Sequence, residues 1–224
     1  MKEIIVDVDM LSEMSEEIDV KKEATLMRDI ILELKRIIRE KNIPALSAPQ
    51  IGYNKRLFVV NFNGDLRTFI NPVLSANPEL ELSREKCASI PGKEFLRIRH
   101  AKCRLMYQTP LGKCEQASFV GLAAKVIQEQ VDHLNGLLLS DVGLEVDNDF
   151  FEATEAERNE VINAYLDALD LKEKQLAKEI NEDAELKQLQ DAGEFLASVQ
   201  SGETEIGRDP IAKEDLQKLV DENK

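Results

Sequence analysis

The sequence of 224 residues contains no tryptophan, and aromatic residues make up only 5% of it. Cysteine and histidine are also scarce, with three and two residues. An odd number of cysteines excludes a fully paired disulfide framework, so we expect reduced thiols. No stretch approaches the roughly 20 consecutive apolar residues of a membrane span. The acidic start MKEIIVDVDM also lacks the basic region of a signal peptide, so we expect a cytoplasmic protein.

Charge is unevenly distributed along the chain. Residues 1–145 contain 21 acidic and 20 basic side chains, whereas residues 146–224 contain 22 and 9. This change of composition predicts a globular domain over residues 1–145 and an acidic extension over residues 146–224. The excess of negative charge on the extension argues against nucleic acid and anionic membranes as partners, because both would repel it.

The first part of the chain has the pattern of an α+β domain. Apolar residues at helical spacing predict a helix over residues 23–39 and another that begins at Gly121. Runs of β-branched and aromatic residues predict strands over four segments: 56–62, 67–72, 103–108 and 115–121. Asn63 and Gly64 between the first two strands are a typical hairpin turn. Residues 45–56 are expected to form a loop, and residues 75–100 are expected to be irregular because they contain prolines and glycine.

The acidic extension is predicted to be helical. Thr154 and Glu157 have the spacing of a capping box, and a long apolar stripe follows them. Two shorter helices are expected over 184–199 and after Asp209-Pro210. Such narrow apolar stripes are marginal in isolation. We therefore expect the extension to pack on the globular domain, on a protein partner or on a second copy of the chain.

Three separated stretches combine residue types that suit a metal site. They are ALSAPQIG at 45–52, EKCASIPG at 85–92 and IQEQVDHLNG at 127–136. In order and spacing they resemble the three motifs of the peptide deformylase family, G-x-G-L-A-A-x-Q-x-G, E-G-C-L-S and Q-H-E-x-D-H. The resemblance covers roughly residues 20–145 and implies a fold of antiparallel sheets around a central motif helix.

The resemblance also implies roles for individual residues. In this family a cysteine and two histidines one helical turn apart hold a divalent metal, and a glutamate beside the first histidine is the general base. The matching residues here are Cys87 and His133 as ligands, with Gln50 and the backbone N–H of Ala88 as donors to the oxyanion. The alternative for His133 is a core histidine that is hydrogen-bonded to the backbone. Cys103 and Cys114 fall in expected strands, where we expect them to pack rather than bind metal.

Several positions depart from the family pattern. Glu129 stands where the first histidine is expected, and Gln130 stands where the general base is expected. Lys86 replaces the glycine before Cys87, and the first motif has Ile43, Ala45 and Ser47 in place of Gly, Gly and Ala. A carboxamide cannot accept the proton of an attacking water at neutral pH. A thiolate and a carboxylate together also neutralise a divalent cation, which weakens it as a Lewis acid.

These departures lead to three hypotheses. The first is a pseudoenzyme whose retained fold and acidic extension serve binding or assembly, with Fe, Ni or Zn held at partial occupancy by Cys87, Glu129 and His133, and with a peptide N-terminus as a candidate ligand of the groove. The second is an active N-formylmethionine peptide deformylase with an unusual Cys/Glu/His site. The third is a structural subunit of a larger assembly such as a virion, in which case a phage-encoded chain would be virion-associated rather than cytoplasmic.

Overall fold

The computed structural model describes residues 3–171 of the chain. The chain divides into two compact units, Met1–Thr154 and Glu155–Lys224. The division falls after the boundary predicted near Glu145. The difference arises because β8 (Leu144–Val146) pairs with a strand of the first unit, and the short helix α5 (Asn148–Glu152) follows it directly.

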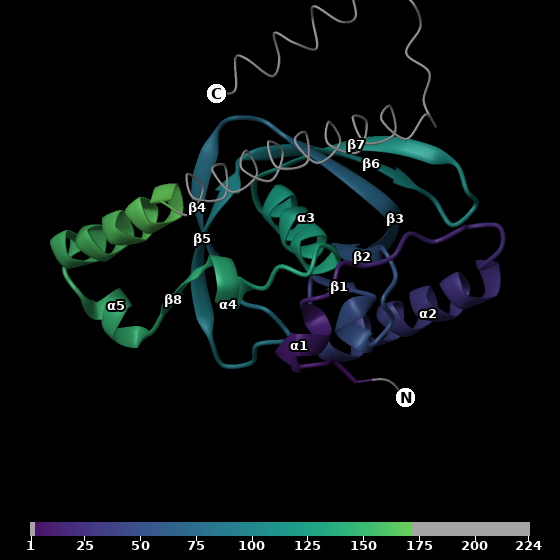
Figure 1. Ribbon diagram of the computed structural model, residues 1–224, viewed down its shortest axis with the longest axis horizontal. Coiled ribbons are helices and arrows are strands. Elements are labelled where there is room, and N and C mark those ends of the chain that lie inside the picture. The colour runs from purple at the N-terminus through teal and green to yellow at the C-terminus, as the bar shows by residue number, and fades with distance from the viewer. Residues whose placement is uncertain (1–2, 172–224) are drawn as a thin grey trace, which may run out of the picture. The chain divides into compact units, whose positions relative to one another are not determined.

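The first unit contains two antiparallel sheets (Figure 1). The larger sheet has the strand order β1-β2-β3-β6-β7, with bounds Ala45–Ser47, Leu57–Phe62, Asp65–Ala76, Lys102–Gln108 and Cys114–Val120. The smaller sheet has the order β4-β5-β8, with β4 at Leu80–Glu85 and β5 at Glu94–His100. The predicted hairpin is present as β2 with β3, and the strands predicted over 103–108 and 115–121 pair with each other as β6 and β7. At the first hairpin turn Asn63 and Gly64 have φ values of 52° and 98°, as a two-residue turn of this kind requires.

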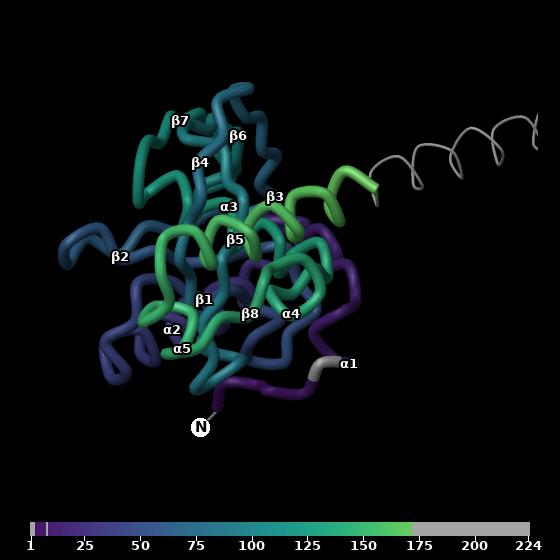
Figure 2. Tube along the Cα trace, turned by 90° about the vertical axis from the view of Figure 1, so that its left-hand side faces the viewer, coloured from purple at the N-terminus to yellow at the C-terminus, as the bar shows by residue number. Residues whose placement is uncertain are grey.

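Two longer helices accompany the sheets. The helix α2 (Ala24–Lys41) lies against β1 and β2, and α3 (Gly121–Leu134) contacts strands of both sheets. Figure 1 shows α3 in the middle of the first unit, and in Figure 2 β4 and β5 lie in front of it. This arrangement confirms the α+β fold with antiparallel sheets around a central helix. Two shorter helices, α1 (Val8–Leu11) and α4 (Leu139–Val142), and the 3-10 turn η1 (Pro49–Ile51) complete the unit.

Two hydrophobic clusters stabilise these elements. The first joins β1, η1 and β2 to the apolar face of α2, whose buried residues are Met27, Ile30, Ile31, Leu34, Ile37 and Ile38. The second joins the sheet to α3 through the buried side chains of Ala124, Ile127, Val131 and Leu134. Each such side chain contributes roughly 1.5–3 kcal/mol when it leaves water. The two clusters therefore hold η1 and α3, which carry polar residues of two motifs, on a rigid base.

Two expectations about irregular segments are wrong. The predicted loop over 45–56 contains the three-residue strand β1 and the turn η1. The predicted irregular stretch over 75–100 contains β4 and β5, which pair from Leu80 with His100 to Glu85 with Phe95. Their sequences LELSRE and EFLRIRH are rich in charge, so they lack the apolar signal of a strand. Pairing between the two segments, and not local preference, makes them strands.

The second unit is described only in its first part. Residues 155–171 form a helix, as the capping box and the apolar stripe predicted. The helices predicted over 184–199 and after Asp209-Pro210 lie outside the described residues. No helix within residues 3–171 is long and apolar enough to cross a membrane.

Candidate metal centre and cleft

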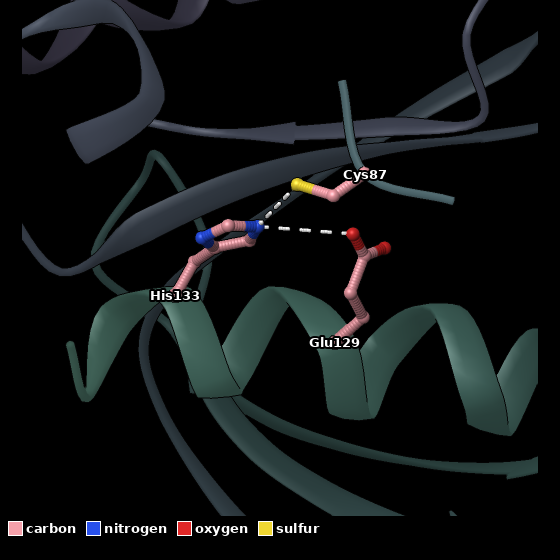
Figure 3. A group of neighbouring side chains, drawn as sticks. All are labelled: Cys87, Glu129 and His133. Atoms are coloured by element: carbon pink, nitrogen blue, oxygen red, sulfur yellow. Dashed lines mark hydrogen bonds and ion pairs between the residues drawn. The ribbon is translucent and has the colours of Figure 1, made fainter. Parts of the chain in front are cut away.

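Three potential metal ligands from two motifs converge in the structure (Figure 3). Cys87 lies in the loop between β4 and β5, whereas Glu129 and His133 lie one turn apart on α3. The Sγ of Cys87 is 3.1 Å from Nε2 of His133, and Oε1 of Glu129 is 3.7 Å from the same nitrogen. One potential ligand atom from each of the three residues lies within 4.8 Å of the other two. Residues separated by more than 40 positions in the sequence thus form one cluster.

The cluster is little exposed and strongly polar. Cys87 and His133 are buried, with 3% and 1% of their surface exposed. Burial lowers the pKa of His133, but the Cys87 thiol group and the Glu129 carboxylate raise it by more, to about 10. The Nδ1 atom of His133 is buried and makes no hydrogen bond within the described part of the chain. The interactions of His133 therefore come from these two side chains and not from the backbone.

Gln50 is placed beside the cysteine by its own hydrogen bonds. Its Oε1 accepts hydrogen bonds from the backbone N–H and the hydroxyl of Ser47, each at 3.0 Å. This fixes the orientation of the amide, so that Nε2 points to Sγ of Cys87 at 3.6 Å and to the hydroxyl of Ser89 at 3.2 Å. The serine at position 47, a departure from the family motif, thus helps to orient the retained glutamine.

Glu129 and Gln130 form a second polar pair on α3. Nε2 of Gln130 donates to Oε2 of Glu129 at 3.3 Å. The Gln130 side chain is buried, and its Oε1 has no hydrogen-bond partner among the described residues. Both residues line the same cleft. The position expected to hold the family's general base therefore carries an amide whose oxygen has no hydrogen-bond partner among the described residues.

A buried ion-pair network connects the second and third motifs. Arg99 on β5 donates from Nε and Nη2 to the carboxylate of Glu85, both at 2.8 Å, and from Nη1 to Asp132. Only 3% of the Arg99 side chain is exposed. Burial would lower the pKa of the guanidinium, but Glu85 and Asp132 raise it above its ordinary value. Because Glu85 precedes Cys87 by two residues and Asp132 precedes His133 by one, Arg99 sets the position of the cysteine loop relative to α3.

The cluster opens into a cleft of about 540 Å³, which lies in the range of small-ligand sites. Its lining includes Ile43, which precedes β1, Ala45 at the start of β1, and Val146 of β8. Ala88, whose N–H is the expected oxyanion donor, also lines the cleft. The side chain of Lys86 is exposed and pairs with Glu94 at 3.2 Å, so it points to the rim of the cleft. The cleft is thus lined by apolar residues together with polar and charged ones.

The residues of the cluster fit a divalent transition metal. A thiolate, an imidazole nitrogen and a carboxylate oxygen are the ligand types that Zn²⁺ accepts, and all three face one another here. Cys87, Glu129 and His133 would hold the ion. When bound, such an ion supplies Lewis acidity to a coordinated group. The carboxylate of Glu129 would add a second negative charge to that of the thiolate.

The structure brings together every residue that the sequence singled out. Gln50, Cys87, Ala88, Glu129 and Gln130 line the cleft, and His133 is buried beside Cys87. Cys103 packs in the core as expected, whereas Cys114 is exposed, so the expectation of packing is wrong for Cys114. The outward position on β7 explains its exposure.

Sequence reasoning missed three contributors to the site. Ser47, Ser89 and Arg99 make the hydrogen bonds that orient the motif residues. Ser47 and Ser89 lie within the quoted motifs, so their hydroxyls were an available signal. Arg99 is one of several arginines in a charged strand, and only the pairing of β4 with β5 shows its role.

Comparison with known proteins identifies the family. The model of the Polypeptide deformylase family matches residues 1–147, and the chain belongs to this family. A peptide deformylase of Prochlorococcus marinus (strain NATL2A) is 36% identical over 102 residues, which cover 43% of this chain and 50% of that protein. The chain thus spans about half the length of this curated relative.

Solved structures agree with the family assignment. The crystal structure of peptide deformylase from Thermotoga maritima has a TM-score of 0.59 at 28% identity and covers 63% of this chain and 97% of that chain. A peptide deformylase from Synechococcus elongatus, solved in complex with actinonin, has a TM-score of 0.59 at 25% identity and covers 73% of this chain and 85% of that chain. The fold of the first unit is therefore the deformylase fold.

Proposed function

We propose that this chain is a peptide-deformylase-like pseudoenzyme, which holds a peptide end in its cleft without hydrolysing a formyl group. The observation that carries the proposal is Gln130, a buried amide at the position of the family's base. Gln50, Cys87 and His133 remain close together, so the binding end of the cleft is retained. The complex of a related structure with actinonin supports a ligand groove of this kind.

The residues around Gln130 do not replace the missing base. Its neighbour Glu129 accepts a hydrogen bond from Gln130 and lies next to His133, which suits a ligand or a structural carboxylate. Glu94 and Glu145 at the cleft pair with lysines, at 3.2 Å to Lys86 and 2.8 Å to Lys93. General base catalysis contributes roughly 10²–10⁴ in rate. Its loss leaves a protein that binds without efficient turnover.

A formate-release assay tests this proposal. The native chain, supplied with Ni²⁺, Fe²⁺ or Zn²⁺ and a formyl-methionyl tripeptide, should release no more formate than the Cys87→Ala variant. The comparison with this variant separates the cluster's own activity from background hydrolysis. Turnover by the native chain that disappears in Cys87→Ala would contradict the proposal.

The second candidate is an active deformylase with an unusual Cys/Glu/His site. It is favoured by the intact cluster of Cys87, Glu129 and His133 and by the retained orientation of Gln50 toward Cys87. In this case Glu129 would have to accept the proton in place of Gln130. The same formate-release assay distinguishes the two candidates.

Metal content gives an independent prediction. The set of one thiolate, one carboxylate and one imidazole lacks the second histidine of the family, so we expect weaker retention of a divalent ion. Protein purified without added metal should contain clearly less than one equivalent of zinc, nickel or iron by elemental analysis. Full occupancy that survives mild chelation would instead favour the active enzyme.

A further inference from the structure

The polar end of the cleft is rich in hydrogen-bond acceptors. Oε1 of Gln130 is buried and has no hydrogen-bond partner within the described residues, although the side chain lines the cleft. The carboxylate of Glu129 lies beside it and lines the same cleft. An unsatisfied buried acceptor destabilises the folded protein, and a ligand that donates a hydrogen bond to it would remove this cost.

The orientation of the Gln130 amide follows from its neighbour. A carboxylate only accepts hydrogen bonds, so Glu129 must face the NH₂ group of Gln130 and not its oxygen. The amide oxygen is then left without a partner among the described residues. A glutamate at position 130 could donate a proton to a ligand oxygen, but the amide oxygen cannot. The pair Glu129–Gln130 thus favours a ligand group that donates hydrogen bonds over one that accepts them.

The other acidic residues of the cleft have partners of their own. Glu94 pairs with Arg84 and Lys86, Glu145 pairs with Lys93, and Asp147 caps the start of α5 through the N–H of Phe150. Glu129 has no lysine or arginine partner in the part of the chain that the structure describes. Its neighbour His133 also contacts Cys87: Nε2 of His133 lies 3.7 Å from Glu129 and 3.1 Å from Sγ of Cys87.

We propose that Glu129 and Gln130 bind the α-ammonium group of a peptide whose N-terminus is unformylated. An ammonium group has three N–H donors and a positive charge, which match the two acceptors and the carboxylate charge. A formyl group would remove the positive charge and leave a single N–H donor at this nitrogen. The inference rests on the proposed function, because it names the kind of peptide end that the cleft holds.

Isothermal titration calorimetry on the full chain tests the inference. The ligand is a tripeptide that begins with methionine, prepared with a free amine, an N-formyl or an N-acetyl group. Because charge-assisted hydrogen bonds are about twice as strong as neutral ones, the free amine should bind at least about tenfold more tightly than either capped form. The preference should persist after treatment with a chelator, since it comes from the side chains and not from coordination to a metal.

Matched variants locate the effect. Glu129→Gln keeps the shape but removes the charge and should abolish the preference for the free amine. Gln130→Leu removes the amide oxygen and should lower the affinity for the peptide with a free amine. Glu145→Gln also removes a carboxylate from the cleft, but one that Lys93 already pairs, so the preference should remain.

The outcomes separate this inference from the proposed function. Equal binding of the three peptides, tighter binding of the formyl form, or loss of free-amine binding after chelation would overturn the inference and leave peptide binding in place. Failure of all three peptides to bind would refute both. If Glu129→Gln does not fold, the three peptides compared on the native chain still decide the question.

Discussion

The double variant Glu129→His, Gln130→Glu should release formate from a formyl-methionyl tripeptide at least about 100-fold faster than the native chain. This is the lower end of the contribution of a general base, roughly 10²–10⁴. Both positions lie on α3 and line the cleft, so the new histidine would join Cys87 and His133, and the new glutamate would occupy the place of the base. Nε2 of Gln50 already points to Cys87, as the donor to an oxyanion would have to do.

The single variants serve as controls for this experiment. Gln130→Glu alone supplies a base without the second histidine, and Glu129→His alone supplies the ligand without the base, so each should stay well below the double variant. Formate release is measured with Ni²⁺ or Fe²⁺ present, and thermal unfolding checks that each variant folds. A folded double variant that holds one equivalent of metal and remains inactive would show that Gln130 is not what limits catalysis.

Arg99→Met should lower the free energy of unfolding by about 3–5 kcal/mol, the usual cost of removing one partner from a buried ion pair. The guanidinium is 3% exposed and binds Glu85 and Asp132, whose side chains are 10% and 20% exposed. Methionine would fill similar space but leave two carboxylates with little access to water. Because the network joins the Cys87 loop to α3, metal affinity should fall as well.

An exposed ion pair provides the matched control. Arg67 pairs with Asp65 at 2.7 Å, but both side chains are about 60% exposed. Arg67→Met should therefore change the free energy of unfolding by less than about 1 kcal/mol. Urea denaturation of the two variants and the native chain measures the difference. Equal effects of the two substitutions would contradict the structural role of Arg99.

Much of the fold could be predicted from local sequence patterns. The helices α2 and α3 have apolar residues at a spacing of three and four, which a helix turns onto one face. The hairpin of β2 and β3 has its turn signal at Asn63 and Gly64. The strands β4 and β5 could not be found in this way, because nearly half of their side chains are charged and the strands form only by pairing with each other.

The candidate site could likewise be predicted only in part from the sequence. The motifs identified the candidate site residues Cys87, Glu129, Gln130 and His133. They also showed that the usual base is replaced by an amide. The convergence of these residues depends on packing between α3 and the loop after β4. The role of Arg99 could not be predicted, because the local sequence of a charged strand does not show which arginine is buried.

The sequence alone determined the chemistry that is available: a thiol, an imidazole, a carboxylate and an amide at the positions of three deformylase motifs, because side-chain identity sets which groups can donate, accept or ionise. The tertiary structure alone decided how these groups meet. It placed Nε2 of Gln130 against Glu129 and left the amide oxygen buried without a partner at the cleft. It also enclosed Arg99 between two carboxylates. These outcomes depend on distances and burial between segments far apart in the chain, which local sequence patterns do not encode.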